Sequence, residues 1–148
     1  MSEKIKPILY ELTINKEQAE TLVKALDMYS RIGMGQLENI TDHPDVHKRI
    51  MDSDIIDSIP DAWSLFNKAK RVLFDMDSNA SHGIYSDGIS DINRIAWDIQ
   101  RVVRHRLAWD SANNPPKRNW NTMMSVNYDT PNKSSQLPLP TIKRVELE

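Results

Sequence analysis

The sequence predicts an α+β fold, in which three main helices pack on a small antiparallel sheet built from the two ends of the chain. Residues 7–14 alternate like a strand, three central stretches repeat apolar residues with helical spacing, and residues 141–147 alternate again. The length of 148 residues fits one domain, which we expect to span residues 1–148.

The sheet is predicted from three short segments. Residues 7–14 have one fully apolar face, and residues 124–128 and 141–147 alternate in the same way. Between the last two, the proline-containing stretch 132–140 is expected to be extended, near polyproline geometry. So thin a sheet leaves exposed strand edges, which favour pairing with another subunit.

The first helix is expected over residues 16–40. Asn15 has a typical N-cap side chain, and Gln18 stands at the capping-box position three residues later. Apolar residues then recur every three or four positions, which indicates an amphipathic helix. Gly33 lies on the apolar stripe, and we expect it to allow close approach of the third helix, because glycine inside a helix otherwise costs about 1 kcal/mol.

The middle of the chain predicts two more helices and a loop. A short helix should begin at Pro44, because proline is favoured in the first turn. A second main helix is expected over residues 59–76, capped by Ser58, and a loop over residues 77–90. The apolar stripe of the second main helix consists of Ala62, Leu65, Phe66, Ala69, Leu73 and Met76.

The third main helix, expected over residues 91–110, carries the candidate site. Ser90 or Asp91 should cap it, and the Asn-Asn-Pro-Pro run at 113–116 should end it. Its apolar stripe consists of Ile92, Ile95, Ala96, Ile99, Val102, Val103 and Leu107. The opposite side carries Arg94, Trp97, Arg101, Arg104, His105 and Ala108.

That opposite side has the composition of an anion site. Arginine grips phosphate with a planar fork, and the face of Trp97 can stack on a base or on a guanidinium. The alternative is a solvated helix face, with one tryptophan packed under arginine stems. Tyr85, Arg31 and Gln36 complete the candidate ligand-binding set.

Arg106 falls within the apolar stripe, where a buried guanidinium needs a partner. It should either pair with a carboxylate such as Asp110 or reach into a cleft and bind ligand. His43 and His47 have helical metal-ligand spacing, but Pro44 replaces the glutamate of the usual zinc-hydrolase motif, so we interpret this segment as a surface turn. No catalytic residues, metal ligands or cofactor are predicted.

Composition limits the classes of function. The formal net charge of −2 argues against a DNA coat protein or a polybasic membrane binder, although a local basic patch remains compatible with it. The absence of cysteine excludes disulfides, thiol nucleophiles and zinc-thiolate sites. No apolar run reaches the ~20 residues of a membrane span. With no signal-peptide stretch at the N-terminus, we expect a soluble cytosolic protein.

Three segments resemble a family of small phage-encoded proteins: residues 16–40 with the string RIGMGQ, residues 102–110 with RHRLAWD, and the PLPTI run at 138–142. The chain is similar to the Thoeris anti-defence sponges. This resemblance implies a non-enzymatic protein in the host cytoplasm that sequesters glycocyclic ADP-ribose or a cyclic oligonucleotide. It also implies a homo-oligomer whose subunits share the pockets.

Two other classes of function stay open. One is a phage protein-protein inhibitor or accessory protein that acts through the aromatic residues Trp63 and Phe74 and through sheet edges. The other is a nucleotide hydrolase that uses His43, His47 and nearby aspartates, for which metal dependence and product formation would be diagnostic.

Overall fold

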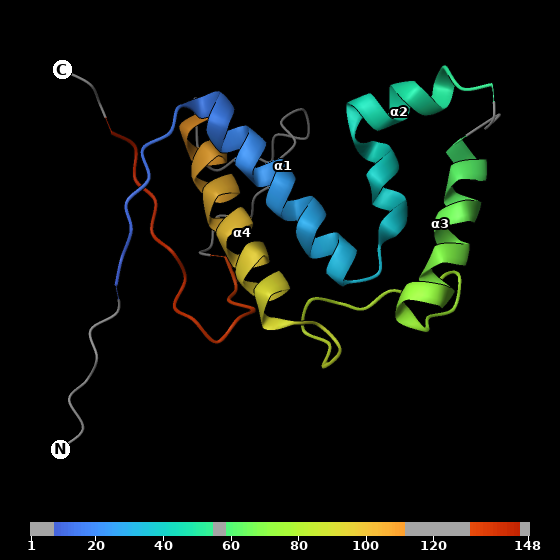
Figure 1. Cartoon of the computed structure of the whole chain (residues 1–148). Helices are drawn as coiled ribbons and strands as arrows, with labels where there is room; N and C mark the ends of the chain where they lie inside the picture. The colour runs from blue at the N-terminus through green and yellow to red at the C-terminus, as the bar shows by residue number, and fades with distance from the viewer. Residues whose placement is uncertain (1–7, 55–58, 112–130, 146–148) are drawn as a thin grey trace.

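The computed structural model describes residues 8–54, 59–111 and 131–145. Its elements follow in the order α1 (Lys16–Gly33), the 3-10 helix η1 (Leu37–Asp42), α2 (Pro44–Met51), α3 (Ile59–Phe74) and α4 (Asp91–Ser111). Helices α1 and α4 form one pair, while η1, α2 and α3 form a second group beside it (Figure 1).

Helix α1 begins where its capping residues predict. The Asn15 side chain accepts a hydrogen bond from the Gln18 backbone N–H at 2.8 Å, and the Gln18 side chain accepts one from the Asn15 N–H at 2.9 Å. The capping box is therefore confirmed. The helix ends at Gly33, not at residue 40, because Gly35 adopts a left-handed conformation (φ +71°) that turns the chain. Residues 37–42 then form the separate helix η1.

Helices α1 and α4 run antiparallel and approach closely at Gly33. A Cβ atom at this position would overlap the Asn93 side-chain amide, so only glycine fits without a shift. The Ser30 hydroxyl donates to the Asn93 carbonyl at 3.1 Å, and the Asn93 side-chain amide donates to the Tyr29 carbonyl at 3.0 Å. The expected packing of the first and third main helices at Gly33 is confirmed, with Asn93 as the residue that meets it.

Two apolar clusters lie on different sides of α4. Cluster 1 is built around Ala19, Val23 and Val103, and it also receives Ile14 and Ile142 from the extended ends of the chain. Cluster 2 is formed by Met34, Ile84 and Ile89, with Trp97 of α4 packed against it. Helix α4 is therefore covered on two sides, and its predicted division into one apolar and one polar face is wrong at Trp97.

The second group of helices is held together partly by polar contacts. Lys70 of α3 is 1% exposed, and its Nζ lies 3.1 Å from a Glu38 carboxylate oxygen of η1. The Trp63 indole N–H donates to the Thr41 hydroxyl at 2.9 Å. Lys70 is buried in α3, whereas the predicted stripe residues Leu65 and Leu73 are exposed.

A buried carboxylate anchors the C-terminal segment to α4. Asp98 is 2% exposed and accepts four hydrogen bonds of 2.7–2.9 Å, two from backbone N–H groups and two from hydroxyls, all of Ser134 and Ser135. Burial alone raises the pKa of a carboxyl group. Here the four hydrogen bonds outweigh it and hold the pKa of Asp98 below its ordinary value. We call this contact the Asp98 clasp.

The predicted sheet is wrong: in residues 8–54, 59–111 and 131–145 every regular element is a helix. Residues 8–14 and 141–145 are extended as expected, but neither segment forms a hydrogen-bonded ladder in this part of the chain. One side chain from each segment, Ile14 and Ile142, packs against cluster 1.

The other predicted boundaries have mixed outcomes. The short helix at Pro44, the second main helix to within a turn, and the third main helix are confirmed. The Ser58 cap, the 113–116 helix stop and the 124–128 strand lie outside the described residues. Ile92, expected in the apolar stripe of α4, is 62% exposed. One domain over residues 1–148 stays a prediction.

Candidate functional site

The first part of the site is a polar triplet at the end of α1. Arg31 Nε donates to an Asp27 carboxylate oxygen at 2.7 Å, and Arg31 Nη1 donates to the Gln36 side-chain oxygen at 2.8 Å. Asp27 and Arg31 meet because they are four residues apart on one helix face. Gln36 comes back to Arg31 because the turn at Gly35 directs the Gln36 N–H to the Arg31 carbonyl, at 2.9 Å.

Helix α4 contributes the second part. Trp97, Arg101 and Arg104 recur at helical spacing, so they share one side of α4. The Arg101 guanidinium carbon lies 6.0 Å from the centroid of the Trp97 ring, which is within the range of a cation–π contact.

Arg104 joins these two parts electrostatically. Burial lowers the pKa of its guanidinium below the ordinary value, the positive charges of Arg101 and Arg31 lower it further, and the carboxylate of Asp27 acts in the opposite direction. Arg31, Arg101 and Asp27 therefore each lie within electrostatic range of Arg104. We call these four residues the arginine cluster.

The arginine cluster has three positive groups and one negative group. Guanidinium groups held near one another repel. An anion with several acceptor oxygens, such as a phosphate group, would lower this repulsion and could accept bidentate hydrogen bonds. The chemistry of this arrangement is therefore anion binding next to an aromatic ring.

Comparison of the chain with protein-family models, curated proteins and solved structures gives no match. The resemblance to Thoeris anti-defence sponges stays a prediction, so the site must be judged from its own geometry.

The structure brings together five of the nine predicted ligand-binding residues: Arg31, Gln36, Trp97, Arg101 and Arg104. Trp97 is half-buried against cluster 2, so its indole is partly covered within its own chain and is not the open plate that the sequence predicts.

The other four have different surroundings. Arg94 Nη2 donates to the Ser86 carbonyl at 2.8 Å and so ties the preceding loop to α4. His105 Nε2 accepts from the Trp109 indole N–H at 3.1 Å. Tyr85 is 62% exposed on the loop before α4.

The structural alternative for Arg106 is confirmed, because its guanidinium binds the Asp110 carboxylate through two nitrogens, Nε at 3.1 Å and Nη2. This pairing raises the pKa of Arg106. Its side chain is 39% exposed, so the expectation of a buried arginine is wrong.

His43 and His47 lie at the start of the short helix α2 and are exposed. Within residues 8–54, 59–111 and 131–145, no group of three or more potential ligand residues is arranged to hold a metal ion. No helix in the same ranges combines the length and apolar character needed to cross a membrane.

Sequence reasoning missed two carboxylates, Asp27 in the arginine cluster and Asp98 in the clasp. Asp27 carried a usable signal, since an aspartate four residues before an arginine on a helix predicts an ion pair. Asp98 carried none, because its partners Ser134 and Ser135 are 36 and 37 residues away in the sequence.

Proposed function

We propose that the protein binds a cyclic nucleotide-type immune signal, glycocyclic ADP-ribose or a cyclic oligonucleotide, and sequesters it without degrading it. It would act as a phage anti-defence protein in the host cytoplasm. The observation that supports this proposal best is the arginine cluster beside Trp97, which joins three guanidinium groups, one carboxylate and an aromatic ring.

Each part of the cluster has a role in this proposal. Arg101 and Arg104 contact the phosphate oxygens, because a guanidinium presents parallel N–H donors at the spacing of two such oxygens. Asp27 and Gln36 hold Arg31 in place through bonds of 2.7 and 2.8 Å, so its position is set before ligand arrives. Trp97 backs Arg101 with its ring.

Self-association is the second component of the proposal. A small chain encloses a nucleotide-sized ligand most easily between subunits, and the arginine cluster lies where two helices meet rather than deep in one core. Binding and assembly should then support each other.

The proposal is tested by thermal shift of the purified protein with a panel of cyclic nucleotides and glycocyclic ADP-ribose. A ligand present at 100 times its Kd adds about 2.7 kcal/mol of stability. In a domain of this size, that corresponds to a rise of about 5–10 °C in the melting temperature.

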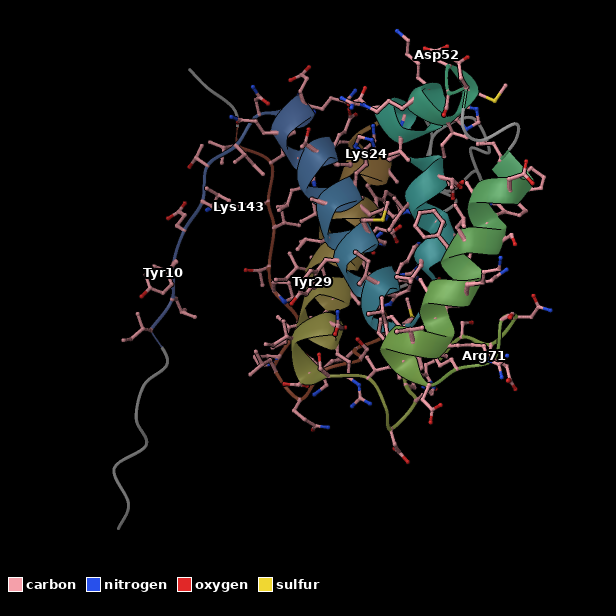
Figure 2. The ribbon with its side chains drawn as sticks, turned by 45° about the vertical axis from the view of Figure 1, so that its right-hand side comes forward. Tyr10, Lys24, Tyr29, Asp52, Arg71 and Lys143 are labelled. Atoms are coloured by element: carbon pink, nitrogen blue, oxygen red, sulfur yellow. The ribbon has the colours of Figure 1, made fainter. Side chains whose placement is uncertain are left out.

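Arg101→Glu should abolish this rise, because a charge-assisted contact is lost and repulsion of the phosphate is gained. The matched control is Arg71→Glu, the same charge reversal on the exposed side of α3, which should keep the full rise (Figure 2). Light scattering of both variants tests whether Arg101 instead holds subunits together, in which case the oligomer dissociates. The proposal fails if no member of the panel raises the melting temperature, or if Arg101→Glu responds like the wild type.

A second candidate function is favoured by the outer face of α3. Leu65, Val72 and Leu73 are 54%, 85% and 67% exposed. Exposed apolar side chains gathered on one side of a helix are typical of protein-binding surfaces. An inhibitor that binds a host protein through this face would show a protein partner and no nucleotide-dependent melting.

A further inference from the structure

The N-terminal extended segment exposes more apolar surface than its surroundings explain. Ile8, Leu9, Tyr10 and Leu12 are 80%, 85%, 93% and 70% exposed. Figure 1 shows this segment leaving the helices, and in Figure 2 the labelled Tyr10 lies apart from all of them. We call residues 8–13 the N-terminal arm. Four large apolar side chains in so short a run form an interaction surface rather than scattered exposed residues.

The backbone of the arm has no hydrogen-bonded partner strand among the described residues. The arm is extended and has the alternation of a strand, with Ile8, Tyr10 and Leu12 on one face. In the described part of the chain its backbone forms no ladder. Unpaired strand edges favour pairing with another strand.

The other extended segment of the same chain does not fill this role. Residues 141–145 come close to the base of the arm, since Ile14 and Ile142 contact the same cluster 1. The two segments cross in Figure 1 instead of running together, and no ladder forms between them in the described residues. Within residues 8–54, 59–111 and 131–145, no segment of the same chain pairs with the strand-type sequence of the arm.

We propose that the N-terminal arm pairs with the same arm of a second copy of this chain, as an antiparallel two-stranded ladder centred on Tyr10.

The arm is complementary to itself in this register. With Tyr10 opposite Tyr10, Ile8 of each strand lies opposite Leu12 of the other, so the apolar faces coincide. Leu9 then lies opposite Glu11 on the other face. The neighbouring register, centred on Glu11, places two carboxylates directly opposite each other, which is destabilising. Antiparallel pairing of identical segments has two-fold symmetry and closes as a dimer rather than extending as a filament.

This inference deepens the self-association that forms part of the proposed function. It is independent of the arginine cluster, which lies on α1 and α4. Its test measures assembly with no nucleotide present. If the arms do not pair, the thermal-shift experiment still tests ligand binding. If no nucleotide binds, the assembly experiment still tests whether the arms pair.

The absence of cysteine from the chain allows a direct test by single-cysteine crosslinking. In the proposed register the two Cβ atoms of residue 10 lie about 4.5–5.5 Å apart. This spacing is close enough for a disulfide after a small adjustment. Tyr10→Cys should therefore give a crosslinked dimer under mild oxidation on a non-reducing gel, at protein concentrations where random collision is slow.

Thr13→Cys is the matched control, because residue 13 is also exposed and lies on the same arm. Residue 13 lies three residues from the centre of the ladder on each strand, and the two copies lie on opposite sides of the centre. At about 3.4 Å per residue they are separated by about 20 Å along the ladder and should not crosslink. A second variant, Leu12→Lys, should shift sedimentation of the full chain from dimer to monomer, with an unchanged circular dichroism spectrum because this side chain is 70% exposed.

Three results would overturn the proposal. Equal crosslinking of both cysteine variants would indicate mobile arms that collide at random. Crosslinking of Thr13→Cys alone would indicate another register. A wild-type monomer, together with no crosslink at residue 10, would show that the arms do not pair.

Discussion

At the scale of single residues, Gly33 and Asn93 decide how closely α1 and α4 lie. The sequence places a glycine on an apolar stripe, which favours a close contact with a small residue such as Ala96. The structure instead puts the Asn93 side chain over Gly33, where its amide also donates to the Tyr29 carbonyl. The close approach is thus secured by hydrogen bonds, and the missing Cβ makes room for a polar side chain.

Gly33→Leu should overpack this contact and destabilise the protein by about 1–3 kcal/mol, which lowers the melting temperature by several degrees. Gly33→Ala separates packing from helix propensity, because alanine has a higher helix propensity than glycine, although at the last residue of α1 its gain is smaller than the ~1 kcal/mol of a helix interior. A lower melting temperature for Gly33→Ala therefore identifies the overlap with Asn93. Gly83→Ala is the control, since a Cβ there would lie 3.8 Å from the Ser86 hydroxyl, an ordinary contact. Gly33 variants that melt like this control would contradict the prediction.

At the scale of elements, the Asp98 clasp connects the C-terminal segment to α4. Ser134 and Ser135 are 8% and 3% exposed, so the four donors and the carboxylate are shielded from water together. The Ser134 hydroxyl also lies 3.1 Å from the Arg94 carbonyl, on the same side of α4. Loss of the carboxylate would leave buried donors without their acceptor, which costs more than the hydrogen bonds alone.

Asp98→Asn should lower the free energy of unfolding at pH 7 by about 3 kcal/mol, because hydrogen bonds to a charged group are worth about 1.5–3 kcal/mol each and are not additive. The pKa of Asp98 is lower when the protein is folded. The stabilisation is therefore fully present above the unfolded-state pKa of about 3.9 and is lost as the pH falls through the lower, folded-state pKa.

Urea unfolding at pH 7 and at pH 3 or below measures both effects for the wild type and for Asp98→Asn. The difference between them should shrink in acid. Asp91→Asn, at an exposed position of the same helix, is the control for the loss of one negative charge. A difference that is absent at pH 7, or that stays constant down to low pH, would be evidence against the clasp.

At the scale of the whole molecule, the α1–α4 pair and the η1–α2–α3 group meet through a few polar and apolar contacts. Gly35 lies between α1 and η1, and Met76 lies between α3 and α4. The two residues are close together, since a Cβ at Gly35 would lie 2.7 Å from the Met76 sulfur. The His82 N–H donates to the Met34 carbonyl at 2.9 Å in the same region. The arginine cluster depends on the first of the two groups, and the exposed apolar face of α3 belongs to the second.

A protein that sequesters its ligand should return it unchanged. After loading with the panel member that raises the melting temperature most, heat denaturation and chromatography should recover the intact nucleotide in stoichiometric amount. The reason is that the arginine cluster supplies cationic donors and an aromatic ring but no activated nucleophile. Ligand heated without protein is the control. Recovery of a hydrolysis product that forms only with protein present would instead support the hydrolase alternative.

Features that depend on neighbouring residues in the sequence were predicted correctly, whereas the contacts between helices were not. Asn15 with Gln18, and Pro44 at the first turn of α2, act within one helical turn, so the sequence alone locates these helix starts. The spacing of Trp97, Arg101 and Arg104 likewise follows from one helix. The electrostatic effect of Arg31 and Asp27 on Arg104 depends on how α1 packs against α4, which no local pattern contains.

The sequence by itself determined where helices start, where α4 places its arginines, and that residues 8–14 and 141–145 are extended. Only the tertiary structure decided what covers each face: Lys70 is buried while Leu65 and Leu73 are exposed, and Trp97 packs on cluster 2. The same holds for the missing sheet. Alternation makes a segment extended, but a ladder forms only where another strand lies alongside, and in the described residues of this chain none does. Caps and helical periodicity act within a few residues, whereas burial and strand pairing depend on which distant elements meet.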